Sequence, residues 1–368
     1  MSATVSFVIP CYKLAHVLGE CIDSILAQTH TDLEILVMDD QSPDETPEVV
    51  RKYADPRVIH IRNEKNLGHL ANYNKGIGMA RGQYVWLISA DDSLLSAHVL
   101  ERFVGLMERI PSLGYIFCPV IPHVHHRTVD ISPFWYRAPS DAVLEGRVFL
   151  ERLAESNCVP APAVLVRKAC YERAGVFPLD LPYAGDWYMW CLFAAYYDVA
   201  YLAEPMVRYR WHEDNLTHQL RKRDRRILDE DELKVRWRVA RLLDACHLER
   251  QAAVWWKSLA QHYATLVERR ELEGGRAGLS LAEAAVSCAT YAARRSERSR
   301  VAGQVFGTLA DRRLRAGRVA EARNLYGEAL KKSPASPRSW AKFLLSCAGR
   351  RGVEVRRAIT HARHGIDW

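Results

Sequence analysis

Two pairs of neighbouring aspartates are the first candidates for ligand binding or catalysis in this sequence. Asp39-Asp40 and Asp91-Asp92 each follow a short apolar run that is typical of a buried strand. Carboxylates at 39 and 40 could accept hydrogen bonds from a base N–H and from ribose hydroxyls. The alternative is a turn in which Asp and Ser42 cap the following helix, and for this motif alone the turn is the better interpretation.

The second pair has a different chemistry. Adjacent acids at the end of an apolar strand repel each other and lose hydration, so Asp91 and Asp92 are tolerated best when a cation compensates their charge. Mg²⁺ and Mn²⁺ prefer one or two carboxylates together with phosphate oxygens. Acids also suit the first turn of a helix, and for this pair alone the two interpretations are equal.

A third acid, Asp186, lies in the segment Tyr183-Ala184-Gly185-Asp186-Trp187. A carboxyl group between aromatic residues could be partly desolvated, and its pKa would then rise towards that of a general base. The alternative is an N-cap Asp that opens a helix reaching Tyr196, which is the better interpretation of this motif alone.

Histidines occur in two further motifs. In Tyr209-Arg210-Trp211-His212-Glu213, His212 could bind a metal or contact a phosphate, and Arg210 could neutralise a phosphate. A salt-bridge cluster at a strand end is the alternative. The group His123, His125 and His126 has mixed spacing and no Cys partner, so we interpret it as surface or acceptor-side residues and not as a zinc site.

The elements that must position these residues alternate along the first 120 residues. Apolar runs predict strands at 5–9, 33–38, 58–61, 84–88 and 115–120, and helical spacing predicts helices at 17–26, 43–53, 70–80 and 97–109. This βαβαβ rhythm predicts a mostly parallel sheet with helices on both faces. Ligands of such sheets bind beyond the carboxyl ends of the strands, where residues 10–12, 39–40 and 89–92 stand.

The rest of the chain is less regular and then becomes helical. A strand-like piece is expected at 159–167 and a helix at 186–196, and from about residue 224 the pattern is all-helical, interrupted at Gly274-Gly275. Residues 317–334 resemble one tetratricopeptide unit, which is a weak signal because several such units must stack to bury a core.

Length and charge suggest two parts. The 368 residues are 49% hydrophobic, which is enough for two domains. Residues 221–368 hold 32 Lys+Arg against 17 Asp+Glu, whereas residues 1–220 hold 19 against 27. A basic surface attracts lipid headgroups, phosphates or acidic polymers, but solvated Arg-rich helix faces explain the excess equally well.

Other features exclude several classes of protein. The nine cysteines are odd in number, widely spaced and without a CxxC pair, which argues against a disulfide framework and for a reducing compartment. No signal peptide or spanning helix is visible, so we expect a cytoplasmic protein whose membrane contact, if any, is peripheral, on the inner face. No phosphate loop, GxGxxG or GxSxG is present, and nucleic acid is not an expected partner.

Taken in order, these pieces resemble glycosyltransferase family 2, whose members are inverting enzymes with the GT-A fold. The resemblance covers about residues 4–218. Its motifs are Val8-Ile9-Pro10-Cys11-Tyr12, Ser24 to Thr29, Glu34 to Ser42, Asn66-Leu67-Gly68 with Asn72, Asn74, Gly76 and Ala80, Gly82-Gln83-Tyr84-Val85, Ala90-Asp91-Asp92, Gly175-Val176-Phe177, Asp186-Trp187 and Tyr209-Arg210-Trp211-His212.

The resemblance implies a role for each matching residue. Asp186 is implied as the base that deprotonates the acceptor, and a Mn²⁺ or Mg²⁺ ion is implied at Asp91, Asp92 and His212. The implied nucleotide-sugar site consists of Pro10, Tyr12, Asp39, Asp40, Ser42, Asn66, Asn72, Ser89 and Asp91. Asp40 is expected to accept from a base N–H, and Asp91 to hold the cation that bridges the diphosphate, with Asp92 as the alternative ligand.

Two positions depart from the family pattern. Ser89 stands where the family often has the first Asp of Asp-x-Asp-Asp, so the ribose contact of that carboxylate is either weaker here or made by the Ser89 hydroxyl. The metal ligand is left open between Asp91 and Asp92. Gln41 stands where Gly often follows the paired acids, which could adjust the turn or the base preference.

We therefore expect a GT-A catalytic domain at 1–220 and a basic, partly tetratricopeptide-like helical domain at 221–368. The expected function is metal-dependent, inverting transfer of a sugar, a hexose from a UDP-sugar by resemblance, onto an acceptor hydroxyl of a glycan, polysaccharide or glycolipid. The alternatives are a non-catalytic protein that binds nucleotide-sugars or a partner through its helical domain, and a transferase to a polyprenyl phosphate. The helical domain could dock the acceptor, form a homo-oligomer or contact a membrane surface.

Overall fold

The structure of the chain, a computed structural model, describes residues 4–124, 127–128, 135–212, 215–272, 298–332, 334 and 337–347. Five residues named above, His125, His126, Glu213, Gly274 and Gly275, lie outside the described residues. The chain divides into two compact units, residues 1–235 and 236–368. The boundary predicted between residues 220 and 221 falls within helix α8 (Leu216–Arg223).

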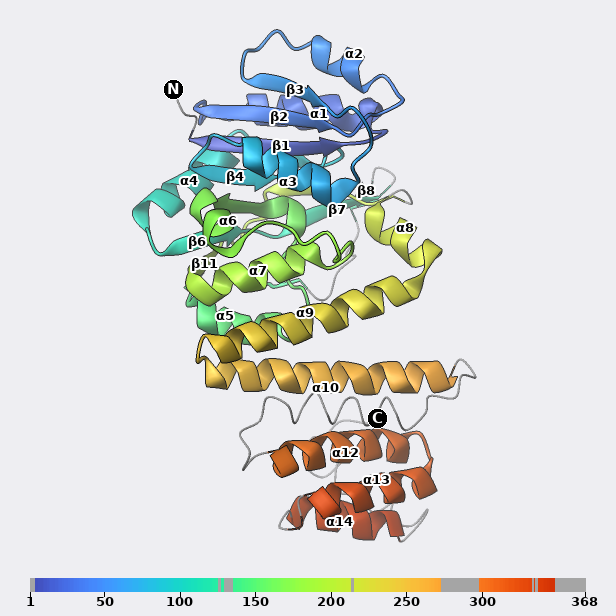
Figure 1. Cartoon of the computed structure of the whole chain (residues 1–368). Helices are drawn as coiled ribbons and strands as arrows, with labels where there is room; N and C mark the ends of the chain where they lie inside the picture. The colour runs from blue at the N-terminus through green and yellow to red at the C-terminus, as the bar shows by residue number, and fades with distance from the viewer. Residues whose placement is uncertain are drawn as a thin grey trace. The chain divides into compact units, whose positions relative to one another are not determined.

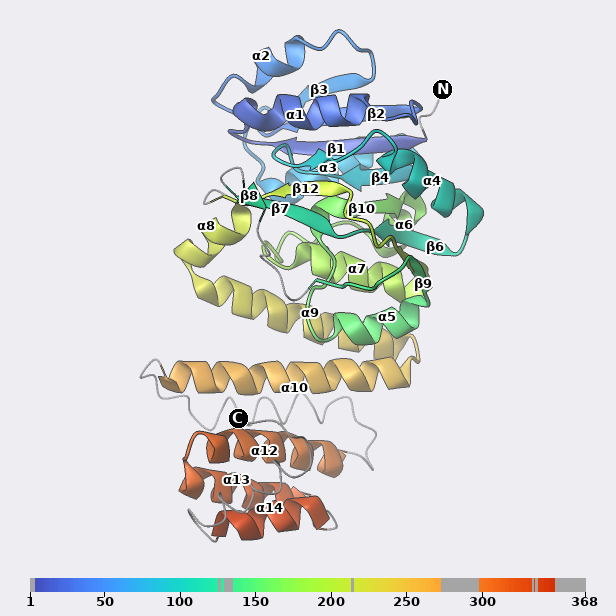
Figure 2. The same cartoon turned by 180° about the vertical axis from the view of Figure 1, so that it is seen from behind.

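A large mixed sheet forms the centre of the first unit (Figures 1 and 2). In its described part, eight strands run in the order β3-β2-β1-β4-β10-β6-β11-β9. Their bounds are β1 (Val5–Cys11), β2 (Leu33–Asp39), β3 (Val58–Arg62), β4 (Tyr84–Leu87), β6 (Leu113–Phe117), β9 (Ala142–Leu144), β10 (Val164–Arg167) and β11 (Asp198–Tyr201). The strands β3, β2, β1 and β4 are mutually parallel, β10 is antiparallel to both of its neighbours, β11 is parallel to β6, and β9 is antiparallel to β11.

Helices cover both faces of this sheet. The helices α3 (His69–Met79), α6 (Lys168–Ala174) and α7 (Gly185–Tyr196) lie on one face (Figure 1), and α1 (Ala15–Leu26) and α4 (Val99–Arg109) lie on the other (Figure 2). The remaining helices of this unit are α2 (Thr46–Arg51), α5 (Gly146–Leu153), α8 and the first part of α9 (Arg225–Ala245). The predicted class, a mostly parallel sheet between helices followed by a helical region, is confirmed.

The core of the sheet follows from its sequence. Strands β1 and β2 are buried along almost their whole length, as parallel strands covered on both faces must be. Phe7 of β1 stacks on Trp86 of β4 with ring centroids 5.5 Å apart, and Trp86 contacts Phe103 of α4 at 4.6 Å. Gly76 lets α3 approach the sheet, because a Cβ there would stand 2.4 Å from Val8 Cγ1.

Strand register brings the ends of β1, β2 and β4 to one edge of the sheet. Cys11 of β1 is opposite Asp39 of β2, and Asp39 is opposite Arg62 of β3. Strand β4 ends beside β1, with Leu87 opposite Val8. The segments that follow these strands therefore leave the sheet at the same carboxyl edge.

A second sheet, with four strands among the described residues, lies beside the carboxyl edge of β4. Its order is β5-β12-β7-β8, with β5 (Ser93–Leu94), β7 (Val120–Val124), β8 (Arg127–Thr128) and β12 (Val207–Arg210). Strand β5 begins directly after the Asp91-Asp92 pair, and β12 pairs with it so that Arg208 is opposite Ser93. The sheet thus joins two motifs that lie more than a hundred residues apart in the sequence.

Three sequence predictions need local correction. The strand expected at 115–120 ends at Phe117, and β7 begins only at Val120, because Pro119 lacks the N–H needed to continue the ladder. The strand expected at 159–167 begins at Val164 after a short 3-10 turn, Ala161–Ala163, that contains a proline. The helix expected at 43–53 spans only Thr46–Arg51.

The predicted helix cap at Ser42 is wrong. Helix α2 has Glu45 at its N-cap position and a proline in its first turn. Asp44 makes the local turn instead, since its carboxylate accepts hydrogen bonds from the backbone N–H groups of Ala15 and Thr46 at 2.9 and 3.2 Å. The Ser42 hydroxyl accepts from the backbone N–H of Lys13 at 3.2 Å and so holds the turn after β1.

The second unit is helical throughout its described residues. It contains the end of α9, then α10 (Glu249–Leu272), α12 (Arg298–Arg315), α13 (Val319–Lys332) and α14 (Pro337–Cys347). Ala310 and Leu314 of α12 pack on Ala322 and Tyr326 of α13. Gly317, at φ +74°, makes the turn between these helices, a conformation that glycine adopts without steric cost. The comparison with a tetratricopeptide unit stays a prediction.

No helix in the described residues is long and apolar enough to cross a bilayer. The eight cysteines that the structure describes are all free thiols, and six of them are buried.

Candidate active site

The Asp91-Asp92 pair follows β4 at the junction of the two sheets. Asp92 is 2% exposed, and its carboxylate accepts a hydrogen bond from the backbone N–H of Arg210 at 3.0 Å. Burial, and then the charge of Asp91, raises the pKa of Asp92 well above its usual range. Asp92 thus holds the end of β12, and Asp91 is the acid that remains for a ligand.

Asp91 meets His212 across the second sheet. The two side chains are 121 residues apart in the sequence, yet His212 Nε2 lies 2.9 Å from Asp91 Oδ2. Asn215 supports both residues, because its amide oxygen accepts from the His212 backbone N–H at 2.5 Å and its amide nitrogen lies 3.5 Å from the same Asp91 oxygen. Asn215 is a site residue that sequence reasoning missed, since it lies outside the quoted motif, three residues after His212.

Arg210 makes the salt bridge that the sequence offered as the alternative for this motif. Its guanidinium forms an ion pair with Glu20 of α1 at 2.6 Å and donates from Nε to the backbone carbonyl of Asp91 at 3.2 Å. These contacts join the Asp91 turn to α1, and the neutralisation of a phosphate by Arg210 stays a prediction.

Asp186 lies in the first turn of α7, whose N-cap residue is Ala184. The alternative in which Asp186 is itself the N-cap is therefore wrong. Its carboxylate accepts hydrogen bonds from the Asn157 side-chain amide at 2.9 Å and from the Trp187 backbone N–H at 2.7 Å. Burial nevertheless raises its pKa to about 6, which is the range of a general base at neutral pH.

The charges of Asp186 and of the acidic pair affect the same two tyrosines. Burial raises the pKa of Tyr73, on α3, and of Tyr209, on β12, and the charges of Asp91, Asp92 and Asp186 raise both pKa values further. The charges of all three carboxylates thus act on the same two tyrosines. Tyr73 and Tyr209 were not predicted as site residues, since a tyrosine at helical or strand spacing resembles an ordinary core residue.

Asp40 organises the loop after β3. One of its carboxylate oxygens accepts from the Asn63 amide and from the Leu67 backbone N–H, both at 2.8 Å, and the other accepts from the Gly68 backbone N–H at 3.0 Å. A carboxylate oxygen has two lone pairs, so one acceptor position remains on the second oxygen. The expected contact with a base N–H stays a prediction, and it can use only that position.

The predicted asparagines also shape this loop. The side chain of Asn66 donates to the backbone carbonyl of Asp40 at 3.2 Å and accepts from the Gly68 N–H at 3.0 Å. Asn72 is buried, donates to the Met38 carbonyl at 2.8 Å and accepts from Asn63 at 2.9 Å. Asn72 therefore packs α3 against β2, and it supports the predicted site from inside the fold.

The carboxylate of Asp39 makes contacts within the fold. It is fully buried and accepts from the Ser42 backbone N–H at 2.7 Å, while Arg62 and His60 of β3 lie at 2.9 and 3.2 Å from its other oxygen. Gln41, between these turns, adopts φ +57°, so the left-handed turn that glycine would favour is kept with a larger residue.

The remaining predicted residues lie at the same carboxyl edge. Tyr12 is 43% exposed, with the Lys13 ammonium 5.2 Å from its ring centroid, and Pro10 and Ser89 are partly buried. Pro10, Tyr12 and Ser89 thus stand at the ends of β1 and β4, where the sequence predicted the donor site.

His123 lies on β7 in the second sheet. It is partly exposed, and its backbone carbonyl accepts from the Trp211 backbone N–H at 2.9 Å. This contact extends the pairing of β7 with β12 to the residue before His212. The interpretation of His123 as a surface or acceptor-side residue stays a prediction.

Asp91 and His212 supply only part of the ligand set that a divalent cation needs. Among the described residues, no group of three or more His, Cys, Asp or Glu side chains could hold a metal ion by itself. Asp91 Oδ2 and His212 Nε2 supply one oxygen and one nitrogen, a pair that suits Mn²⁺ when phosphate oxygens and water complete its coordination. The residues therefore fit a cation that binds together with a diphosphate.

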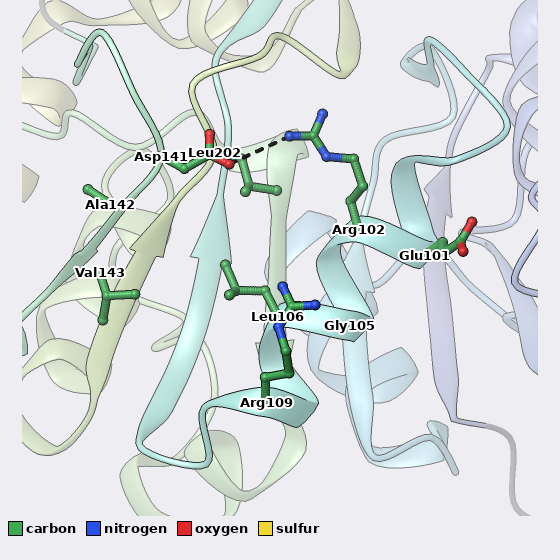
Figure 3. A pocket seen from close by; sticks show the side chains of 9 residues that line it. All are labelled: Glu101, Arg102, Gly105, Leu106, Arg109, Asp141, Ala142, Val143 and Leu202. Carbon is green, nitrogen blue, oxygen red and sulfur yellow. Dashed lines mark ion pairs between the residues drawn. The ribbon is translucent and has the colours of Figure 1, made fainter.

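A cavity of about 400 Å³ lies elsewhere in the first unit, between α4 and β9 (Figure 3). Arg102 of α4 and Asp141, just before β9, form an ion pair of 3.6 Å at its rim. The cavity is lined by Glu101, Arg102, Gly105, Leu106, Arg109, Asp141, Ala142, Val143 and Leu202. None of the predicted site residues is among them, so this cavity is separate from the acidic cluster.

The comparison with known families agrees with the geometry. Residues 6–136 match the family model described as glycosyl transferase family 2. Residues 6–136 of this chain are therefore a glycosyltransferase family 2 segment. The match covers β1 to β8 and therefore includes the turns of Asp40 and Asp91, while Asp186 and His212 lie beyond it.

Two proteins of similar sequence are also called glycosyltransferases. An uncharacterized glycosyltransferase of Rickettsia typhi is 26% identical over 220 residues, which are 59% of this chain and 67% of the relative. The uncharacterized glycosyltransferase EpsJ of Bacillus subtilis is 30% identical over 193 residues, 50% of this chain and 54% of EpsJ. The chain thus spans 54% to 67% of the length of these relatives.

Solved structures agree on the fold. The structure of S. aureus TarS in complex with UDP-GlcNAc has a TM-score of 0.53 and 16% identity, and the alignment covers 99% of this chain and 93% of that one. The predicted family, the GT-A-like fold and the enzyme class are confirmed. The roles of single residues stay predictions.

Proposed function

We propose that this glycosyltransferase moves a sugar from a nucleotide-diphosphate donor to an acceptor hydroxyl with inversion, using Asp186 as the base. The observation that supports the proposal is that the charges of Asp91, Asp92 and Asp186 all act on the same two tyrosines, Tyr73 and Tyr209. Such an arrangement would supply a base and a diphosphate-binding acid to the same region, as a single displacement requires.

The protonation state of Asp186 supports its role. With a pKa of about 6, its carboxyl group is about 90% ionised at pH 7 and can accept the proton of an attacking hydroxyl. The hydrogen bonds from Asn157 and the Trp187 backbone fix the direction of the carboxylate. A base held in this way needs no reorganisation when the acceptor oxygen attacks the anomeric carbon.

Asp91 and His212 are the proposed ligands of a Mn²⁺ or Mg²⁺ ion, with Asn215 holding both in place. A divalent cation bound there would neutralise negative charge on the leaving diphosphate. Asp92 supports the pair from inside the fold through the Arg210 backbone. We assign Asp91 as the main ligand because it is 9% exposed and contacts His212, whereas Asp92 is 2% exposed.

The nucleotide is proposed to lie over the ends of β1 and β2, beside Pro10 and Tyr12. The exposed ring of Tyr12 can stack on a base, and the remaining acceptor position of Asp40 can accept a base N–H. S. aureus TarS has been solved with UDP-GlcNAc, which makes UDP the first nucleotide to test. The acceptor is proposed to be a glycan or glycolipid hydroxyl, as expected from the family.

The experiment compares three variants of the full chain. Asp186→Asn is expected to abolish transfer while UDP still stabilises the protein in a thermal-shift assay with Mn²⁺. Asp91→Ala is expected to lose both transfer and the Mn²⁺-dependent part of that shift. Glu108→Gln, an exposed position on α4, is the matched control and should behave as the unchanged protein. Normal transfer by Asp186→Asn would refute the base assignment.

A further inference from the structure

The segment that leads into α7 is held by residues of α9. Asp231 of α9 is 1% exposed, and one of its carboxylate oxygens accepts from the backbone N–H groups of Tyr183 at 2.7 Å and of Ala184 at 3.2 Å. Ala184 is the N-cap residue of α7, and its own side chain forms no cap hydrogen bond. A carboxylate from a distant helix therefore satisfies backbone donors at the helix start.

Two more contacts fix the same segment. Lys234, one turn after Asp231, donates to the backbone carbonyl of Asp180 at 3.1 Å and lies 3.8 Å from the Asp231 carboxylate. His69 of α3 lies 2.9 Å from the Pro182 carbonyl through Nε2. The backbone from 180 to 184 is thus held at three successive points, two of them from α9, directly before the turn that carries Asp186.

We propose that Asp231 is a positioning residue for the transfer reaction, because its carboxylate fixes the start of α7 and thereby the location of the Asp186 carboxyl group. The inference rests on the proposed role of Asp186 as the base. It adds that the geometry of this base depends on α9, a helix outside the part of the chain that matches the family model.

The side-chain chemistry defines the critical variants. Asp231→Ala removes the acceptor, whereas Asp231→Asn keeps one oxygen that can accept from both N–H groups but removes the charge. Glu230→Ala is the matched control, because Glu230 is the exposed neighbour on the same helix. The donor-binding acids lie on other turns, so nucleotide affinity should not change.

The test measures kcat, donor KM and the pH profile of kcat for the full chain. Asp231→Ala is expected to lower kcat by about 10- to 100-fold, the effect of displacing a catalytic group by about 1 Å, with donor KM within about twofold. The acid limb of its pH profile should move to lower pH, because a loosened segment lets water reach Asp186. Asp231→Asn should restore kcat to within about threefold, and Glu230→Ala should have no effect.

Other results of these variants separate a failure of the positioning role from a failure of the proposed function. Unchanged kcat and pH profile in Asp231→Ala, while Asp186→Asn is inactive, would overturn the positioning role and leave the proposed function intact. Equal loss in Asp231→Asn and Asp231→Ala would also overturn it. Full activity of Asp186→Asn would instead overturn the proposed function. If Asp231→Ala does not fold, Lys234→Ala decides the matter, since it should lower kcat in the same direction, and an unchanged kcat contradicts the inference.

Discussion

The hydrogen bond between Asn157 and Asp186 gives the most direct test of the proposed base. The Asn157 amide donates to the Asp186 carboxylate at 2.9 Å and so favours its charged form. Replacing Asn157 by Ala removes this bond and is expected to raise the pKa of Asp186. A hydrogen bond to a charged group contributes about 1.5–3 kcal/mol, and one pKa unit corresponds to about 1.4 kcal/mol.

We take the lower end of this range, because the Asp186 side chain keeps part of its surface exposed and water can replace some of the lost interaction. The acid limb of kcat should then move from about pH 6 to about pH 7. At pH 6 the ionised fraction falls from about one half to about one tenth, so kcat should fall roughly fivefold, while the plateau near about pH 8.5 is kept.

The assay is the initial rate of transfer at saturating donor from about pH 5 to about pH 9. Glu108→Gln again serves as the control, and its acid limb should stay at the position of the unchanged protein. An acid limb in Asn157→Ala that stays at its original pH, or moves to lower pH, would refute the assignment of this limb to Asp186.

Three further expectations concern stability. Burial raises the pKa of Asp186 from 3.8 to about 6, so its contribution to stability is complete below about pH 4 and is lost as the pH rises through 6. Asp186→Asn should therefore increase the free energy of unfolding in urea at about pH 7.5 by about 1–3 kcal/mol, and an equal gain at about pH 4 would contradict this origin. The buried Tyr84 hydroxyl has no hydrogen-bond partner in the described part of the chain, so Tyr84→Phe should change that free energy by less than about 1 kcal/mol, and a larger loss would reveal a partner. Gly76→Ala should cost about 1–3 kcal/mol because its Cβ would meet Val8, and an unchanged melting temperature would argue against this contact.

Much of the fold could be predicted from local patterns. The first four strands follow from short apolar runs separated by helical spacing, and the position of Asp40 and Asp91 at one edge follows from their parallel arrangement. The insertion of β10 between β4 and β6 could not be predicted, because a strand returning after a long, irregular segment carries no sequence signal for its neighbours.

The site was predictable where chemistry is confined to a short motif. Asp91 and His212 were each identified from such motifs, and the structure adds that they touch. Asn215 and Asp231 were missed because their roles come from hydrogen bonds to residues elsewhere in the chain. The error at Ser42 has the same origin, since its hydroxyl bonds to the turn after β1 and not to the helix that follows it.

The continuity of α9 has a practical consequence for anyone who shortens this protein. A truncated version that stops after residue 220, where the charge pattern changes, would discard both α9 side chains that hold the 180–184 backbone, and it would expose the surface against which they pack. Because α9 runs without interruption to Ala245, a fragment intended for crystallisation or donor screening should extend at least that far.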